Sequence, residues 1–263
     1  MEKILLFIPM YNCEKQIVRV MDQIKGEINN YILEVIIVNN KSTDNGEEAV
    51  IKKIKNDSFD CKIKLLRNQE NYGLGGSHKV AFNYAVENEF DYVIVLHGDD
   101  QGSVSDIIPI LKNGIHKKYD CCLGCRFLPE SKLQGYSKFR TFGNIVFNKI
   151  YSISTHRKIK DLGAGLNLYS TKMLATRFYH TFPDNLTFNC YMLFALNEYQ
   201  QTNIFFPLTW REDDQVSNVK MVKQTWQTFK MAFMYFIKKG NYLSVDTREI
   251  KRENYKSTTI FEN

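Results

Sequence analysis

The chain has 263 residues, of which 44% are apolar and 24% charged, a composition typical of a globular α/β protein. Its 35 Lys and Arg residues exceed its 29 Asp and Glu residues, which gives a formal net charge of +6. This excess suits anionic ligands such as nucleotides and phosphates, but it is too small for the dense basic surface of a nucleic-acid-binding protein. We therefore expect no nucleic-acid partner.

No segment predicts export or membrane insertion. The apolar start, residues 4–8, is too short for a signal peptide, and no uninterrupted apolar run reaches the ~18 residues that span a bilayer. We therefore expect a cytoplasmic protein. The six cysteines include a Cys122-x-x-Cys125 pair, but no second pair or histidine completes a zinc site, so buried, reduced thiols are the better interpretation.

The first 125 residues alternate short apolar runs with helical patterns, which is typical of βαβ units and a mostly parallel sheet. Asp44, with Glu47 three residues later, predicts a capping box at the start of the second helix. Beyond residue 125 the pattern predicts a helix over 139–153. Strands are predicted over residues 4–9, 34–38, 61–66, 92–96, 120–124 and 165–169.

The C-terminal part predicts a basic amphipathic helix. From Val222 to Ile237 the apolar residues follow one another at intervals of three and four, with lysines beside them. Such a helix either packs on the domain or lies in a membrane interface. The last ~20 residues are polar, and we expect them to be loosely ordered.

Polar clusters follow four of the predicted strands at the points where the strands end. Because ligands of open α/β sheets bind outside the carboxyl ends of the strands, the fold is expected to gather these clusters along one edge. The clusters are Tyr11-Asn12, Asn39-Asn40, Asn71-Tyr72-Gly73 and His97-Gly98-Asp99-Asp100.

The peptide after the fourth strand can bind a metal ion. Residues two apart on an extended backbone point the same way, so His97, Asp99 and Gln101 can converge on one divalent cation while Asp100 turns aside. Bound Mg²⁺ or Mn²⁺ would neutralise the charge that grows on a diphosphate leaving group. Taken alone, the peptide fits a polar turn equally well.

The glycine-rich turn over residues 71–78 precedes a helix and offers backbone N–H groups to an anion. It is not a dinucleotide fingerprint, because that pattern requires glycine where His78 stands. It does not complete a serine-hydrolase elbow either. A purely structural turn is the alternative.

In their order along the chain, these motifs resemble the family-2 glycosyltransferases of the GT-A fold. The segments that carry the resemblance are Pro9 to Glu14, Val38 to Asp44, Asn71 to Gly73 and His97 to Gln101. Later segments are similar to the polyprenyl-phosphate sugar synthases of that family, which carry Gly-Ser-Arg, Arg-x-x-x-Ser and an Asp-x-x-x-Gly loop. The matching positions read Gly124-Cys125-Arg126, Arg140 to Asn144 and Asp161 to Gly165.

The resemblance implies an α/β fold of the GT-A type, with a mostly parallel central sheet flanked by helices and a C-terminal helical extension. It implies a catalytic domain over 1–215, with a nucleotide-sugar-binding part over 1–125 and an acceptor-binding part over 126–215, and the extension over 216–263. The implied activity is inverting transfer of a sugar from a nucleotide diphosphate-sugar, of the UDP or GDP type, to a lipid-linked or glycan acceptor in cell-envelope polysaccharide or glycolipid synthesis.

Two alternatives remain. The asparagines and the histidine that replace acidic residues in two motifs would suit a non-catalytic nucleotide- or glycan-binding relative. A sugar nucleotidyltransferase would carry its glycine-rich loop directly after the first strand, where Met10 to Cys13 stand.

The resemblance also implies roles for the donor site. Pro9, Tyr11 and Glu14 would border the base pocket, and Asn39 with Asn40 would hold base and ribose where relatives have two aspartates. The metal set would be His97, Asp99 and Gln101, and a neutral imidazole favours Mn²⁺ over Mg²⁺. The full nucleotide-sugar set is Pro9, Tyr11, Glu14, Asn39, Asn40, Asn71, Gly73, Gly75 and Asp99.

For the acceptor, the resemblance implies binding by Arg126, Arg140, Asn144 and Arg211, although solvated surface arginines are the ordinary alternative. A hydroxyl acceptor requires a catalytic base, whereas an ionised phosphate requires none. A lipid-linked acceptor would place the protein at the inner face of the membrane, in contact through residues 222–239. The candidate bases are Asp161 and Asp184, followed by Glu212, Asp213 and Asp214.

Overall fold

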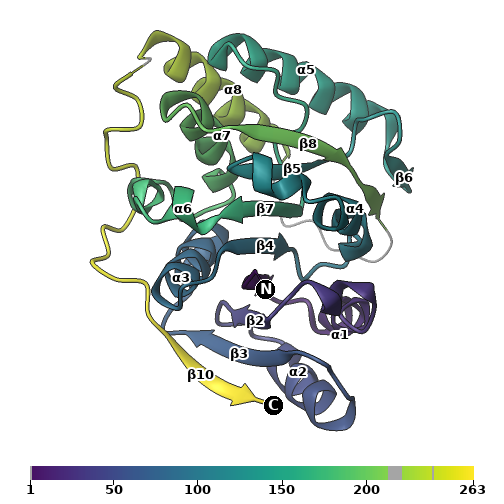
Figure 1. The fold of residues 1–263 in the computed structure, drawn as a ribbon. Coiled ribbons are helices and arrows are strands. Elements are labelled where there is room, and N and C mark those ends of the chain that lie inside the picture. The colour runs from purple at the N-terminus through teal and green to yellow at the C-terminus, as the bar shows by residue number, and fades with distance from the viewer. Residues whose placement is uncertain (1, 213–220, 239) are drawn as a thin grey trace.

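The computed structural model of the chain describes residues 2–212, 221–238 and 240–263 (Figure 1). Its core is an eight-stranded sheet in the order β10-β3-β2-β1-β4-β7-β5-β8. The strands are β1 (Ile4–Met10), β2 (Glu34–Asn39), β3 (Lys62–Asn68), β4 (Tyr92–Leu96), β5 (Cys121–Cys125), β7 (Leu166–Ser170), β8 (Asn203–Pro207) and β10 (Ser257–Glu262). A separate pair consists of β6 (Lys132–Gln134) and β9 (Thr209–Arg211).

The helices cover both faces of this sheet (Figure 1). They are α1 (Glu14–Gln23), α2 (Gly46–Asn56), α3 (Gly73–Glu87), α4 (Ile108–Lys112), α5 (Lys138–Thr155), α6 (Thr171–Leu174), α7 (Phe188–Glu198) and α8 (Met221–Ile237). Short 3-10 helices lie at Glu27–Asn30, Val104–Ile107, Ile115–Lys118 and Phe178–Thr181.

The sheet is mostly parallel, as the sequence predicts. Strands β3, β2, β1 and β4 run parallel to their neighbours, and so do β5 and β8. Strand β7 runs antiparallel between β4 and β5. Every residue of β1 and β2 is buried, which explains their continuous apolar runs, because helices exclude water from both sides.

Alternate residues of β1 contribute to two different cores. Leu5 and Phe7 pack in the core under α3 and α7, whereas Leu6 and Ile8 pack in the core under α1 and α2. The six cysteines are buried and unpaired. The predicted strands and the predicted helix over 139–153 agree with the structure to within two residues at each end.

The predicted capping box at α2 is wrong. Helix α2 starts at Gly46, and the Glu47 carboxylate accepts a hydrogen bond from Asn39 Nδ2 and forms an ion pair with Arg67 instead. Asp44 accepts hydrogen bonds from the backbone N–H groups of Gly46 at 3.1 Å and of Glu14 at 2.9 Å. One carboxylate therefore holds the first residues of both α1 and α2.

The expectation of a loosely ordered C-terminus is also wrong. The chain returns from α8 to the far edge of the sheet, where β10 pairs antiparallel with β3 (Figure 1). The backbone N–H of Lys256 donates to the Tyr72 hydroxyl, and the backbone carbonyl of Lys256 accepts from it. These bonds fix the segment 240–256 that leads to β10. The expected domain boundary between 215 and 216 lies outside the described residues.

Candidate active site

Backbone hydrogen bonds join the ends of three central strands. The N–H of Asn40, after β2, donates to Met10 O at 2.9 Å, and the N–H of Gly98, after β4, donates to Pro9 O at 3.2 Å. A Cβ atom at Gly98 would lie 2.6 Å from Pro9 O, so only glycine allows this approach. The predicted gathering of the polar clusters along one edge of the sheet is confirmed.

The buried side chain of Asn40 connects the ends of β2 and β3 to the glycine-rich turn. Its Oδ1 accepts from Asn68 Nδ2 at 2.9 Å and from the Tyr72 N–H at 2.8 Å, and its Nδ2 donates to Asn71 Oδ1 at 2.7 Å. The amide of Asn40 therefore positions the turn. Asn68 ends β3 as Asn39 ends β2, but it was not among the predicted site residues.

Asn39 lines an open, polar hollow at the surface. Its own amide is engaged within the protein, because Oδ1 accepts from the Ser42 N–H at 2.8 Å and Nδ2 donates to Glu47. Tyr11 is 44% exposed at the end of β1, which leaves its ring accessible to a planar ligand. Glu14 stands at the first position of α1. The hollow offers amide, hydroxyl and charged groups of the kind that a nucleoside can recognise.

The glycine-rich turn packs tightly against the loop before α7. Gly73 has φ +74°, and a Cβ atom there would lie 2.5 Å from the carbonyl oxygen of Asp184. A Cβ atom at Gly75 would lie 2.5 Å from Pro183 O. The N–H of Gly73 donates to Asn71 Oδ1 and that of Gly76 donates to Asp184 O. Packing and local hydrogen bonds thus account for these glycines without a ligand.

The Gly73→Ala variant is expected to unfold more easily than the wild type. The left-handed backbone alone costs an alanine about 1–2 kcal/mol, and the contact with Asp184 adds to this. The matched control is Gly143→Ala in α5, where a Cβ atom would meet nothing within 4 Å and a gain of about 0.5–1 kcal/mol is expected. Urea unfolding checks both, and an unchanged midpoint for Gly73→Ala would contradict the packing described above.

His97 and Asp99 follow β4 in different electrostatic states. The Nε2 atom of His97 is buried and has no hydrogen-bond partner among the described residues. Burial, and secondly the Arg126 charge, lower the pKa of His97 to about 4, so the ring is neutral at pH 7. Burial raises the pKa of Asp99 to about 6, although the Gln101 N–H donates to its Oδ1 at 3.2 Å.

Asp100 turns away from this pair, as expected. It adopts φ +60°, and its carboxylate forms ion pairs with Arg19 at 2.7 Å and with Arg211 at 2.5 Å. Arg211 lies in β9, and its N–H donates to Gln101 O. Arg211 therefore lies beside the peptide 97–101, and its side chain binds Asp100.

These residues fit a divalent cation in part. Among the described residues, no three His, Cys, Asp or Glu side chains are grouped to hold a metal. The feature that favours a ligand here is the buried Nε2 of His97, which has no hydrogen-bond partner among the described residues and is of a type that borderline ions accept. Metal ions at such sites commonly take their remaining ligands from substrate phosphates.

Three of the four acceptor candidates surround Tyr136, a residue that was not among the predicted site residues. The guanidinium carbon of Arg126 lies 5.6 Å from the centre of the Tyr136 ring, and that of Arg140 lies 4.7 Å from it. Asn144 Nδ2 donates to the Tyr136 hydroxyl at 2.9 Å. Two cations and an amide donor therefore converge around one phenol, which is a suitable arrangement for a phosphate.

Asp161 forms a buried ion pair with Arg126. Its oxygens accept from Arg126 Nη2 at 2.7 Å, from Arg126 Nε and N–H at 2.9 Å each, and from the Gly163 N–H at 3.1 Å. Burial opposes the charge on Arg126, but Asp161 raises the pKa of this guanidinium above its usual value. The guanidinium also lies 5.1 Å from the Trp210 ring centre. Asp161 therefore holds Arg126 in place.

Arg140 forms a more accessible ion pair with Glu212, at 2.7 Å and 2.5 Å to the two carboxylate oxygens. The Arg140 side chain is 39% exposed, so an incoming anion can reach it. The two further candidate bases, Asp213 and Asp214, lie outside the described residues.

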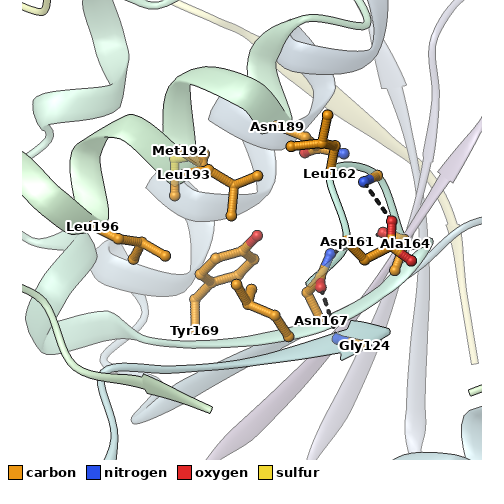
Figure 2. Close-up of a pocket in the computed structure, with 12 residues that line it drawn as sticks. Gly124, Asp161, Leu162, Ala164, Asn167, Tyr169, Asn189, Met192, Leu193 and Leu196 are labelled. Atoms are coloured by element: carbon orange, nitrogen blue, oxygen red, sulfur yellow. Dashed lines mark hydrogen bonds between the residues drawn. The ribbon is translucent and has the colours of Figure 1, made fainter. Parts of the chain in front are cut away.

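A narrow hollow lies between α7 and the loop 161–164 (Figure 2). Met192, Leu193 and Leu196 form one wall, and the Tyr169 hydroxyl points toward Leu193. Asp161 lines the same hollow, so the carboxylate that holds Arg126 also borders a mostly apolar space.

Asp184 belongs to a different cluster at the start of α3. Its carboxylate accepts from Lys79 Nζ at 2.7 Å, from the Tyr255 hydroxyl at 2.7 Å and from Arg252 at 2.9 Å. Lys79 is fully buried, and burial lowers its pKa to about 8 against the opposing effect of Asp184. The cluster therefore fastens the segment before β10, which carries Arg252 and Tyr255, to α3.

The Lys79→Met variant is expected to change how stability depends on pH. The pKa of Lys79 is about 8 in the folded protein and near 10.5 in the unfolded chain, so the unfolded chain binds more protons between these values. Over that window the free energy of unfolding of the wild type should rise relative to the variant, by up to about 1.4 kcal/mol per pH unit. Urea unfolding at several pH values measures the difference, and parallel pH profiles would contradict the prediction.

Comparison with known proteins adds independent information. A family model described as glycosyl transferase family 2 matches residues 6–178. The chain is 24% identical over 181 residues to the UDP-N-acetylglucosamine–dolichyl-phosphate N-acetylglucosaminyltransferase of Methanococcus voltae, and this alignment covers 65% of the chain and 70% of that protein. It is 22% identical over 169 residues to an uncharacterized protein of Methanocaldococcus jannaschii, covering 64% of the chain and 65% of that protein.

Solved structures share the GT-A fold. Glucosyl-3-phosphoglycerate synthase from Mycobacterium tuberculosis in complex with UDP superposes with a TM-score of 0.59 at 11% identity, over 93% of this chain and 81% of that one. S. aureus TarS in complex with UDP-GlcNAc gives a TM-score of 0.55 at 17% identity, over 89% and 66% of the two chains. Because the family model matches well over half of its residues, the chain belongs to glycosyl transferase family 2.

Proposed function

We propose that the protein transfers a sugar, with inversion at the anomeric carbon, from a nucleotide diphosphate-sugar to the phosphate group of a lipid-linked acceptor. The observation that carries this proposal is the arrangement of two neighbouring sites. His97 and Asp99 follow β4, and the His97 N–H donates to Gly165 O at 2.9 Å. The loop 161–165 also carries Asp161, which binds Arg126 of the cluster around Tyr136.

The donor would bind along the carboxyl ends of β1, β2 and β4. Tyr11, Pro9 and Glu14 would border the base, and Asn39 would contribute to the polar hollow next to it. Asn40 and Asn71 would act through the glycine-rich turn, with Gly73 and Gly75 shaping it. The donor would be of the UDP or GDP type.

His97, Asp99 and Gln101 would hold a divalent cation, with Mn²⁺ favoured over Mg²⁺ by the imidazole. When bound, such an ion neutralises the negative charge that develops on the departing nucleotide diphosphate. The unpartnered Nε2 of His97 supports this assignment, because a buried nitrogen without a partner is otherwise costly.

The acceptor would be a phosphate rather than a hydroxyl. Arg126, Arg140 and Asn144 provide charged and amide donors around Tyr136. Arg211 follows Trp210 in β9, whose ring centre lies 5.1 Å from the Arg126 guanidinium carbon, and would extend this set. The two carboxylates first considered as bases, Asp161 and Asp184, each bind cationic side chains in the protein. A phosphate is already ionised at neutral pH and requires no base, so these ion pairs are compatible with transfer.

The glycosyltransferase name of the Methanococcus voltae relative supports a lipid phosphate as acceptor, since that name includes dolichyl phosphate. We further propose that the reaction contributes to cell-envelope polysaccharide or glycolipid synthesis at the cytoplasmic face of the membrane. A glycan acceptor is the competing possibility that the following experiment separates.

The test uses purified protein with Mn²⁺, a panel of UDP- and GDP-sugars, and either a short-chain polyprenyl phosphate or the corresponding polyprenol. Sugar should be transferred to the phosphate only, and NMR should report the inverted anomeric configuration in the product. Transfer to the polyprenol or to a glycan would overturn the proposed acceptor. Nucleotide binding with neither transfer nor slow donor hydrolysis would instead identify a non-catalytic relative.

A further inference from the structure

Helices α5 and α8 expose a large apolar surface at one end of the molecule, where they lie side by side (Figure 1). On α5, Phe139 is 79% exposed and Phe142 is 68% exposed. On α8, Trp226 is 67% exposed and Phe233 is 54% exposed. Soluble proteins rarely leave so many large apolar side chains in water on one surface, so this surface marks an interaction site.

This surface is not needed to hold the two helices on the domain. Tyr151 of α5 and Met231, Ala232 and Tyr235 of α8 are buried on the opposite faces, where the Tyr151 and Tyr235 rings stack on Phe194 of α7. The Tyr151 hydroxyl donates to Thr228 O at 3.2 Å and joins the helices. Of the apolar stripe predicted from Val222 to Ile237, the part from Trp226 onward is therefore the outer face of α8, and a different set of residues packs inward.

The two helices that form the apolar surface carry lysines and no acidic residue of their own. Among the described residues, the acidic side chains that contact them are Glu212, which pairs with Arg140, and Glu198, which accepts from the Tyr235 hydroxyl. Residues 131–160 and 215–245 contain no Asp or Glu. Lys138 and Lys149 on α5 and Lys230 on α8 are exposed, and no acidic side chain among the described residues forms an ion pair with them. Phe142, Val146, Lys149 and Ile153 follow one another at intervals of three and four, which places a lysine within the apolar stripe itself.

We propose that α5 and α8 together form a docking surface for an anionic lipid bilayer. Aromatic side chains among lysines match the acyl boundary and the charged headgroups of such a membrane, whereas a protein partner would have to supply both an apolar and an acidic face. No described helix is long and apolar enough to cross a bilayer.

If the proposed function holds, the docking surface would also orient the acceptor site toward the bilayer. Arg140 and Asn144 lie on α5 with Phe139 and Phe142, but they face Tyr136. One helix would therefore contact the bilayer by its outer face and receive a lipid phosphate on its other face.

The exposed Trp226 is a direct probe of this surface, because the chain has only two tryptophans and Trp210 is buried. In a Trp210→Phe variant, the emission of Trp226 should shift to shorter wavelength with phosphatidylglycerol-containing vesicles and should be quenched by brominated acyl chains. Neutral phosphatidylcholine vesicles should produce a weaker change. Unchanged emission with anionic vesicles would overturn the proposal.

Vesicle cosedimentation provides the matched comparison. The Trp226→Ser/Phe233→Ser variant should lose vesicle affinity by at least about tenfold. The Leu33→Ser/Ile250→Ser control, which removes two exposed apolar side chains elsewhere, should bind as the wild type does. Equal losses in both variants would overturn the proposal. A wild-type dimer that the first variant converts to monomer, without vesicle binding, would assign the surface to a second copy of the chain.

Vesicle binding is measured without donor and metal, and transfer is measured with a short-chain acceptor without vesicles. Failure of docking with transfer intact rejects only the docking surface. Docking without transfer rejects only the proposed function.

Discussion

The Asp99→Asn variant is expected to transfer sugar about 10²–10³-fold more slowly than the wild type, while its fold is preserved. Asparagine keeps the shape of the side chain and can still accept the hydrogen bond from the Gln101 N–H. It removes the carboxylate that, with His97, would hold the cation at the diphosphate. The rate loss should therefore appear in kcat with little change in the urea midpoint.

Asp100→Asn is the matched control for this experiment. Asp100 is the adjacent carboxylate, but it binds Arg19 and Arg211 and turns away from the candidate metal site. Its replacement should lower stability modestly and retain metal-dependent nucleotide binding. A kcat that is unchanged in Asp99→Asn, or lowered more by Asp100→Asn, would contradict the assignment of Asp99.

The Arg126→Met variant is expected to be the most destabilised of the variants considered. Asp161 would remain buried with only the backbone N–H groups of Arg126 and Gly163 as partners. Removing one member of a buried ion pair costs about 3–5 kcal/mol, because the remaining charge is left uncompensated. Urea unfolding measures the loss by linear extrapolation.

The double variant Arg126→Met/Asp161→Leu isolates the cause of that loss. Because it removes both charges, it should recover most of the stability that the single variant loses. Sugar transfer should remain slow in the single and the double variant, because the cluster around Tyr136 lacks the Arg126 guanidinium in both. A double variant no more stable than Arg126→Met would show that cavity formation, rather than the stranded charge, causes the loss.

The central strands could be predicted because buried strands consist of short, continuous apolar runs that the local sequence shows directly. Tyr92–Leu96, for example, is bounded by polar residues on both sides and coincides with β4. The rule that ligands bind at the carboxyl ends of parallel strands then brought Asn40 and Gly98 to one edge, which the backbone hydrogen bonds confirm. The roles of individual site residues stay predictions until they are tested.

The partners of the charged residues could not be predicted, because they come from distant parts of the chain. Asp161 lies 35 residues from Arg126, and Asp184 lies 105 residues from Lys79. No periodic pattern links such positions. Tyr136 was missed for another reason: it lies between β6 and α5, where no helix or strand periodicity predicts that its ring meets Arg126 and Arg140.

Predictions from local sequence patterns were wrong where a tertiary contact determined the structure instead. Glu47 satisfies the spacing of a capping box, but Arg67 on β3 forms an ion pair with its carboxylate. Strand β10 has β-branched and aromatic residues at Thr258 to Phe261, yet its polar surroundings suggested disorder. Its order depends on the free edge of β3, which the sequence of β10 itself does not reveal.

Metal-dependent nucleotide binding is the central claim, and calorimetric titration of UDP and GDP tests it most directly. One of the two nucleotides should bind in the presence of Mn²⁺, lose affinity when EDTA is added, and bind more weakly to His97→Ala than to the wild type. Binding that is equally strong in EDTA, or absent for both nucleotides, would contradict the account of His97 and Asp99 as the seat of the cation.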